Sequence, residues 1–368
     1  MRRIYLDDAG FAPILPAVVQ ARTAAHVEGN ASSPHTEGRA ARARLDALRD
    51  TVARKTGRDR TEVTFVASGT EAVNLAVFGA AARLPTTGRL LTWASEHQSV
   101  LGAFRRLQAQ GRDVRIANVD SEGAVDLDAI EPGVAFVSVG LANNEVGTIQ
   151  PVADVVKRAH AVGALVHVDA CAGPRWIDLP LGADLASLSG QKLGAGRGGV
   201  LLVADGVRID PLLFGGPQEW GRRAGHEDVD AAGALAAAIS ETWSERRAAR
   251  AQAAARQSAR LRSALVELGA QLTGSDSRLP NFASCTFDGR RGEDMLMALD
   301  LAGMAVSSGS ACASGSLDPS HVLLAMGFTL ERSLGSLRLT TGYDTTDEEV
   351  ELAVAILPRV LTRAAAHA

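Results

Sequence analysis

Short apolar runs alternate with longer amphipathic segments along the first 245 residues of the chain. The runs are rich in Val, Leu and Phe and have the length of strands, while the segments between them have the length of helices. Strands separated by helices need crossover connections, which predict a mostly parallel sheet with helices on both faces. The predicted strands are residues 62–66, 89–93, 113–119, 134–140, 164–169 and 200–203, and the predicted helices are residues 71–82, 98–110 and 152–161.

The pattern changes from about residue 228 onward. Residues 230–269 form one long stretch rich in Ala and Arg, which predicts a helix because both residues favour helices. The sequence therefore predicts a large α/β domain over residues 14–245 and a smaller α+β domain made of residues 1–13 and 246–368. Within the smaller domain we expect a strand over 281–288, a helix over 292–302, a segment over 304–312 and a closing helix over 346–366, whose acidic first turn complements the helix dipole.

Composition narrows the class of protein. The chain has 368 residues, of which 46% are hydrophobic and 22% charged, as in soluble globular proteins. Its net charge of −4 gives no general attraction to nucleic acid or to anionic membranes. The chain shows neither a signal-peptide pattern at Met1 nor a long apolar span, so we expect a cytoplasmic protein. Cys171, Cys285 and Cys312 are widely spaced and odd in number, which predicts neither a disulfide framework nor a metal site.

Lys192 is one of only three lysines, against thirty-five arginines. It ends the sequence Ser187-Leu188-Ser189-Gly190-Gln191-Lys192, which lies between an apolar run and the glycine-rich residues 194–199. Where a surface cation suffices, this chain uses arginine, and only an amine can lose its proton and form a Schiff base. The ordinary alternative is a surface lysine in a loop between two strands.

Polar motifs follow several of the other predicted strands. Ser68-Gly69-Thr70-Glu71 joins a strand to a helix, where amides and hydroxyls bind phosphate, although a plain helix cap has the same pattern. His97 and Asn144 also follow strands and Asp169 ends one, and their ordinary alternatives are a structural histidine, an asparagine turn and a cap of the next element. Together with Lys192 these residues suit pyridoxal phosphate, which needs a lysine, an acid beside its ring nitrogen and a phosphate cup.

The three cysteines have different surroundings. Cys312 lies among small residues in Ser307-Ser308-Gly309-Ser310-Ala311-Cys312-Ala313-Ser314-Gly315-Ser316, a composition typical of an exposed loop, and we expect a reactive thiol there. Cys285 lies in a predicted strand, where a cysteine is buried and inert. Cys171 follows Asp169 closely, so we expect it near the cofactor but not as the nucleophile.

These motifs make the chain resemble the cysteine desulfurases, within the class V aminotransferase-like group of fold-type I pyridoxal-phosphate enzymes. The serine-rich cysteine segment is similar to the long mobile loop of the desulfurases that supply iron–sulfur cluster assembly and tRNA thiolation. The resemblance runs along nearly the whole chain and includes Tyr5-Leu6-Asp7, Gly29-Asn30-Ala31-Ser32-Ser33 with His35, Ser68-Gly69-Thr70-Glu71, Glu96-His97, Asn143-Asn144-Glu145-Val146-Gly147, His167-Val168-Asp169-Ala170, the Lys192 and Cys312 segments, Pro319-Ser320-His321-Val322-Leu323 and Gly335-Ser336-Leu337-Arg338-Leu339.

The resemblance implies a role for each matching residue. It implies a fold with a large, mostly parallel domain and a smaller α+β domain, a homodimer, and a reaction of L-cysteine that gives L-alanine and a persulfide on Cys312 for a sulfur-acceptor protein. The implied catalytic residues are Lys192, Cys312 and His97; the implied cofactor-binding residues are Gly69, Thr70, His97, Asn144, Asp169, Ser189, Gln191, Lys192 and His226; and Asn144 and Arg338 are the implied substrate-binding residues.

Three single residues and one short segment depart from the family pattern. Gln191 replaces a histidine, and Ala172 replaces a glutamine that helps to hold the ring hydroxyl. His226 stands in place of a threonine that reaches the phosphate of the partner subunit, and Gly10-Phe11-Ala12-Pro13 lacks paired threonines. One lost hydrogen bond to the charged ring hydroxyl costs about 1.5–3 kcal/mol, so we expect the cofactor to bind with altered affinity or spectrum.

Two alternatives stay open at this point. One is a neighbouring activity on the same scaffold, namely selenocysteine lyase, another C–S lyase or a dedicated sulfur donor in a specialised pathway. The other is a non-catalytic scaffold that binds a sulfur acceptor, although the presence of Lys192, Asp169, His97 and Cys312 argues against it.

Overall fold

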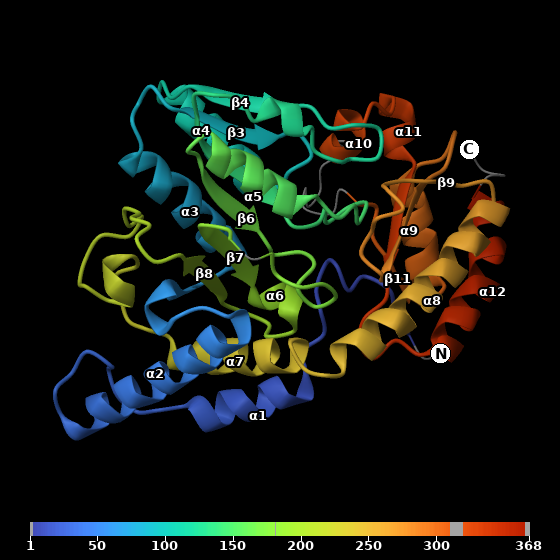
Figure 1. Cartoon of the computed structure of the whole chain (residues 1–368). Coiled ribbons are helices and arrows are strands. Elements are labelled where there is room, and N and C mark those ends of the chain that lie inside the picture. Colours follow the sequence, from blue (N-terminus) through green and yellow to red (C-terminus); the bar gives the residue numbers. More distant parts are fainter. Residues whose placement is uncertain (1–2, 181, 310–318, 365–368) are drawn as a thin grey trace.

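A central sheet of seven strands forms the largest part of the fold in the computed structural model, which describes residues 3–180, 182–309 and 319–364 (Figure 1). All strands of this sheet run parallel except β8, which is antiparallel to both of its neighbours, so the predicted mostly parallel sheet is confirmed. In spatial order the strands are β2 (Val63–Val66), β8 (Gly199–Val203), β7 (Leu185–Ser189), β6 (Leu165–Asp169), β5 (Val134–Gly140), β3 (Arg89–Trp93) and β4 (Val114–Ala117).

Helices cover both faces of this sheet because its strands are apolar on both sides. In β3, for example, Leu90 packs with α3 (Gly69–Arg83) and α4 (Gln98–Ala109) on one face. Its neighbours Leu91 and Trp93 belong to the core on the other face. That second face is covered by α1 (Pro16–Ala25), α2 (Thr36–Thr56), α5 (Val152–Ala161) and α7 (Val229–Thr242).

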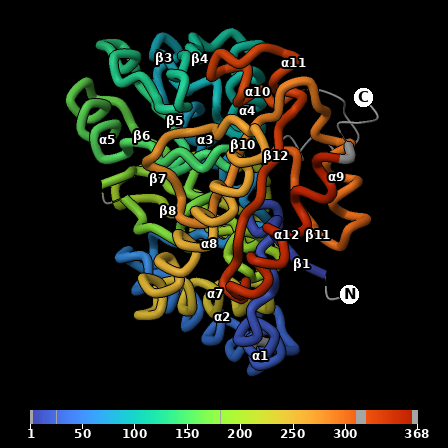
Figure 2. Tube along the Cα trace, turned by 90° about the vertical axis from the view of Figure 1, so that its right-hand side faces the viewer, coloured from blue at the N-terminus to red at the C-terminus, as the bar shows by residue number. Residues whose placement is uncertain are grey.

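A second, smaller core lies beside the large sheet and faces the viewer in Figure 2. An antiparallel sheet and a short parallel strand pair pack there against three helices, with Leu265, Met295 and Leu357 among the contacts. The strands are β9 (Gln271–Leu272), β10 (Phe282–Thr286) and β12 (Ser336–Thr340) in the sheet and β1 (Ile4–Tyr5) and β11 (Met304–Ala305) in the pair; the helices are α8 (Arg247–Glu267), α9 (Gly292–Leu301) and α12 (Asp347–Ala364).

Two short helices complete this region near the edge of the large sheet. They are α10 (His321–Ala325) and α11 (Leu330–Leu334). Val322 and Leu323 of α10 pack on Val146, which follows β5. The segment after residue 318 is thereby fixed against the large sheet.

The long helix predicted over residues 230–269 is wrong, because the chain forms two helices there. The first, α7, ends at Thr242, and α8 begins at Arg247. The alanine-rich α7 packs against α1 and α2, whereas α8 packs against β10 and α12. Composition favours a helix on both sides of the break, but each half is buried in a different core. The chain must turn between them.

The loop predicted around Lys192 is a short helix, α6 (Gly190–Leu193). It starts directly after β7, and Gly194 ends it with a φ of 80°. Gly190 is sterically required, since a Cβ there would lie 2.2 Å from the carbonyl oxygen of Arg197. The turn therefore packs Gly190 directly against the glycine-rich segment that follows Lys192.

Candidate active site

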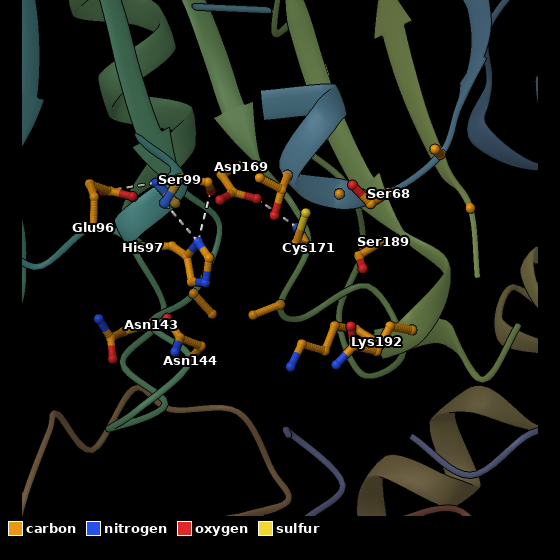
Figure 3. Close-up of a pocket in the computed structure, with 18 of the residues that line it drawn as sticks. Ser68, Glu96, His97, Ser99, Asn143, Asn144, Asp169, Cys171, Ser189 and Lys192 are labelled. Carbon is orange, nitrogen blue, oxygen red and sulfur yellow. Dashed lines mark hydrogen bonds between the residues drawn. The ribbon is translucent and has the colours of Figure 1, made fainter. Parts of the chain in front are cut away.

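A cavity of about 320 Å³ opens at the carboxyl ends of the parallel strands (Figure 3). Ligands of open α/β sheets bind at this edge of the sheet. We use the name strand-end wall for the six residues that end or follow strands there, namely Glu96, His97, Asn143, Asn144, Asp169 and Ser189. The cavity brings together eight residues predicted from the sequence: Gly69, Thr70, His97, Asn144, Asp169, Ser189, Gln191 and Lys192.

The amino end of α3 forms one end of the cavity. Ser68 caps this 15-residue helix by accepting a hydrogen bond from the amide of Glu71 at 3.1 Å. A Cβ on Gly69 would lie 2.7 Å from Sγ of Cys171 and 2.8 Å from Cβ of Ser189, so the helix approaches these side chains as closely as only glycine permits. Helix amides beside the Ser189 hydroxyl form a suitable cradle for phosphate.

Asp169 lies at the end of β6, where it is almost fully buried. Its Oδ1 accepts a hydrogen bond from the amide of Cys171 at 3.0 Å. Burial, with a contribution from the charge of Asp169, raises the pKa of the Cys171 thiol well above its ordinary value. The thiol is therefore held in its protonated, less nucleophilic form.

His97 caps α4 and is oriented by Ser99. Nδ1 of His97 accepts the amide hydrogen bond of Ser99 at 3.1 Å and lies 2.7 Å from the Ser99 hydroxyl oxygen. Because Nδ1 is an acceptor, the neutral ring carries its proton on Nε2. The contacts with Ser99 thus set both the tautomer and the direction of the ring.

Glu96 is a buried acid that the sequence analysis did not select. Its Oε1 accepts a hydrogen bond from the amide of Gly140 at 2.9 Å. Burial raises the pKa of Glu96 to about 8; the hydrogen bond from Gly140 opposes this shift and the charge of Asp169 adds to it. At neutral pH the side chain is mostly a neutral acid. Its place beside His97 was visible in the sequence, but its burial was not.

Lys192 is held from the opposite side by the segment Asp7-Asp8-Ala9-Gly10, which we call the N-terminal segment. Nζ of Lys192 donates to the carbonyl oxygen of Ala9 at 2.5 Å and to that of Gly10 at 2.7 Å. Nε2 of Gln191 also donates to the carbonyl of Gly10, at 2.9 Å. The amine is thus placed between the strand-end wall and the N-terminal segment.

Asp8 forms a buried ion pair just behind Lys192. Its Oδ1 lies 2.6 Å from Nη1 of Arg175, and both side chains are almost fully buried. Burial raises the pKa of Asp8 to about 6, although the charges of Arg175 and Lys192 oppose the shift. The Arg175 guanidinium also lies 3.9 Å from the ring centroid of Tyr343. Sequence reasoning missed this pair because its members come from distant parts of the chain.

Of the predicted site residues that the structure describes, Arg338 and His226 lie outside the main cavity. Arg338 on β12 is directly behind Asn144, and its Nη1 donates to the Asn144 carbonyl at 2.7 Å. His226 is exposed and lines a second cavity of about 570 Å³, which shares Ala67, Arg197 and Gly198 with the first. Cys312 lies outside the residues that the structure describes. By contrast, Cys285 is buried in β10 as predicted, and burial raises the pKa of its thiol to about 12.

The residues of the main cavity fit pyridoxal phosphate. The close approach of Gly69 to Ser189 leaves a phosphate cradle, Asp169 supplies a carboxylate at a strand end, and Lys192 supplies an amine. Within the described ranges, no group of three His, Cys, Asp or Glu side chains is arranged to hold a metal ion. None of the helices in the described part of the chain has the length and apolarity needed to cross a membrane.

The fold and the cavity define a fold-type I pyridoxal-phosphate enzyme, and comparison with known proteins gives the family. Residues 4–352 match the model of the class-V aminotransferases, and the chain belongs to this family. A cysteine desulfurase of Nostoc sp. is 36% identical over 383 aligned residues, which cover 99% of this chain and 94% of that protein.

Two solved structures have the same fold. A NifS-like protein superposes with a TM-score of 0.90 at 30% identity, covering 98% of this chain and 99% of the other. SspA, solved in complex with cysteine, gives a TM-score of 0.81 at 26% identity and covers 93% of this chain and 100% of its own. The predicted family resemblance is therefore confirmed.

Proposed function

We propose that this protein is a pyridoxal-phosphate-dependent cysteine desulfurase. The observation that carries the proposal is the convergence of Lys192, Asp169 and the amino end of α3 on one cavity. The family match and the 36% identity to a named cysteine desulfurase support the same reaction. In this reaction L-cysteine gives L-alanine, and its sulfur is transferred to the enzyme.

The residues of the cavity divide the work of holding the cofactor. Thr70 and Ser189, with the amides that begin at Gly69, would hold the phosphate, and Gln191 would contribute an amide donor. Asp169 would pair with the ring nitrogen and His97 would stack on the ring. Asn144 would contact the ring hydroxyl or the substrate carboxylate region, and Arg338 would bind that carboxylate.

When bound, pyridoxal phosphate withdraws electrons from the substrate Cα and so makes its proton acidic. Lys192 then accepts and returns that proton, for which it must leave the Ala9 and Gly10 carbonyls as a neutral amine. His97, with its proton fixed on Nε2 by Ser99, is suited to assist as a proton donor. Because Glu96 is mainly neutral at pH 7, it does not place a second negative charge beside Asp169.

Cys312 would receive the sulfur. Its thiolate attacks the substrate sulfur, the C–S bond breaks, and the electron pair and a proton go to the carbon that becomes the alanine methyl group. L-Cysteine and the Cys312 thiol thus give L-alanine and a Cys312 persulfide, with no external oxidant or reductant. The persulfide would then be passed to an acceptor protein for iron–sulfur assembly, tRNA thiolation or another sulfur-containing product.

We also propose a homodimer in the cytoplasm. His226 is exposed beside a cavity that adjoins the cofactor cavity, which suits a residue that reaches the phosphate in the other subunit. The segment between β8 and α7, which contains His226, also exposes Leu213, Phe214 and Trp220. These side chains give the region an apolar surface for a partner subunit. The free thiols of Cys171 and Cys285 suit a reducing compartment.

Product analysis with L-cysteine tests the function. We expect stoichiometric alanine, and a persulfide on Cys312 that is trapped by alkylation and lost in Cys312→Ala. Pyruvate and ammonia would instead show β-elimination, and a strong preference for selenocysteine would show a selenocysteine lyase. Equal and negligible alanine release by the wild type and by Cys312→Ala would favour a non-catalytic scaffold. Mixing the enzyme persulfide, before any alkylation, with candidate acceptors would then identify the pathway.

A further inference from the structure

Arg338 is already bound to a carboxylate of its own chain. Its Nη2 lies 2.9 Å from Oδ1 of Asp7, and its Nη1 donates to the Asn144 carbonyl at 2.7 Å. The guanidinium is buried, and its Nε has no hydrogen-bond partner in the described part of the chain. A substrate carboxylate binds an arginine best through two parallel hydrogen bonds. Each terminal nitrogen therefore already uses one of its two N–H groups, and because Nε is buried, a substrate carboxylate meets Asp7 as a competing acceptor on Nη2.

Asp7 is the partner that is able to leave. The Asn144 oxygen belongs to the backbone and stays where the turn after β5 puts it. The Asp7 side chain keeps about a quarter of its surface exposed (26%), whereas that of Arg338 is 4% exposed. The Asp7 backbone is fixed by hydrogen bonds from Gly10, Phe11 and Tyr5 to its carbonyl, so rotation of the side chain alone would free the guanidinium.

The position of Gly10 supports this arrangement. A Cβ on Gly10 would lie only 2.3–2.6 Å from the carboxylate atoms of Asp7. The absence of a side chain at residue 10 therefore leaves the space that the Asp7 carboxylate fills. The carbonyl of the same Gly10 accepts from Lys192 at 2.7 Å. The carboxylate that occupies Arg338 and the carbonyl that holds the amine are thus parts of one short turn.

We propose that Asp7 occupies Arg338 in place of the substrate carboxylate and that the carboxylate must displace it in order to bind. This inference rests on the proposed function, since it takes Arg338 as the site for the substrate carboxylate. It makes Asp7 a specificity-determining residue, because an amine that lacks an α-carboxylate gains no contact when Arg338 is freed. The Asp7 carboxylate and the substrate carboxylate repel each other when both lie against the same guanidinium, so they compete for it.

The test measures equilibrium binding of the reaction product to the holoenzyme. L-Alanine is titrated by calorimetry, and L-alaninamide, which has no carboxylate, serves as the matched ligand. We expect Asp7→Asn to lower the dissociation constant of L-alanine by about three- to tenfold, the range of a partly exposed charge-assisted hydrogen bond. The constant for L-alaninamide should not change. Asp300→Asn, which removes the exposed partner of Arg3, is the control and should change neither constant.

A second variant separates this inference from the proposed function. Arg338→Gln should weaken L-alanine binding at least tenfold and leave L-alaninamide unaffected, and in that background Asp7→Asn should have no further effect. If Arg338→Gln leaves L-alanine binding unchanged, the assignment of Arg338 fails, and the inference fails with it. If Arg338→Gln acts as expected but Asp7→Asn weakens or does not alter L-alanine binding, Asp7 only positions Arg338 and competition is refuted. Circular dichroism and cofactor absorbance confirm that each variant is folded, and Asp7→Ser provides a second removal of the charge.

Discussion

The strand-end wall and the N-terminal segment hold their functional groups in different ways. In the strand-end wall, Asp169 and His97 are fixed by amides only two residues further along the chain. In the N-terminal segment, Asp7 is bound by Arg338 and Asp8 by Arg175, which are 331 and 167 positions away. One side of the site is therefore organised by local turns, and the other by the contact of the N-terminal segment with distant elements.

The two regions also differ in the hydrogen-bond partner of their buried carboxyl group. Glu96 accepts a backbone hydrogen bond, while Asp8 has a guanidinium partner, yet burial raises the pKa of both. For Asp8 this means that the pairing with Arg175 does not fully offset the loss of water. The comparison suggests that local turns set the geometry of the site and that buried charges in the N-terminal segment tie the two cores together.

The largest effect is expected at Lys192, where the two regions meet. Lys192→Ala removes both the covalent anchor of the cofactor and the group that moves the Cα proton, so alanine formation should fall by at least about 10³-fold. The lysine-dependent absorbance of the cofactor should also be lost, which is measured by difference spectroscopy after reduction with borohydride. Lys157→Ala, on the exposed side of α5, should behave as the wild type. An active Lys192→Ala enzyme would remove the basis of the proposed mechanism.

The next effect concerns the stability of the N-terminal segment. Arg175→Met leaves Asp8 buried without its cation, and at pH 8 this should lower the free energy of unfolding by about 3–5 kcal/mol. At pH 5 the loss should be smaller, because the pKa of Asp8 is about 6 and its carboxyl is largely protonated there. Urea unfolding of the apoprotein at the two pH values measures the difference.

The exposed pair of Arg3 and Asp300 provides the control for this experiment. Arg3→Met should leave the free energy of unfolding nearly unchanged at both pH values, because exposed ion pairs contribute little. A similar cost for Arg175→Met at pH 5 and pH 8 would show that Asp8 is not what makes the arginine important. The stacking of Arg175 on Tyr343 would then be the better explanation.

The same contrast explains what the sequence could predict. Asp169 ends an apolar strand, and His97 and Lys192 each follow one; because parallel strands bring their carboxyl ends to one edge, the pattern alone placed them together. The cavity, the mostly parallel sheet and the family resemblance were therefore within reach. The helix over 230–269 was not correctly predicted, because helix propensity says nothing about which core each half joins.

The ion-pair partners of Asp7 and Asp8 in the N-terminal segment could not be predicted from the sequence. Asp7 and Asp8 are adjacent acids near the start of the chain, and nothing local pairs them with Arg338 or Arg175. Their pairing depends on how β1, β6 and β12 are brought together, which is a property of the whole fold. The raised pKa of Glu96 is of the same kind, since burial and not residue type produces it.

Glu96 gives a smaller effect, whose sign depends on pH. Its pKa is about 8 in the folded protein and 4.5 ordinarily, so the folded state binds the proton more tightly. The stability that this provides is fully present below pH 4.5 and is lost as pH rises through 8. Glu96→Gln keeps an acceptor for the amide of Gly140 but cannot ionise, so it should gain on the wild type by a few kcal/mol at most between pH 5 and pH 9.

Unfolding of both apoproteins by urea at pH 5, 7 and 9 measures this gain. A constant difference between wild type and Glu96→Gln across the range would mean that Glu96 does not titrate abnormally. Such a result would also mean that burial in the strand-end wall does not raise the pKa of Glu96.

The smallest effect is expected where a local turn alone orients a functional group. Ser99→Ala removes the hydroxyl 2.7 Å from Nδ1 of His97 but keeps the amide hydrogen bond at 3.1 Å. One hydrogen bond is worth about 0.5–1.5 kcal/mol, so kcat should fall by about two- to tenfold while the stability of the protein barely changes. Ser99→Thr retains the hydroxyl and should restore the rate. If Ser99→Ala instead lowered kcat as severely as Lys192→Ala, the hydroxyl would be part of the chemistry itself. Local turns would then supply catalysis and not only geometry, which would overturn the division between the two regions.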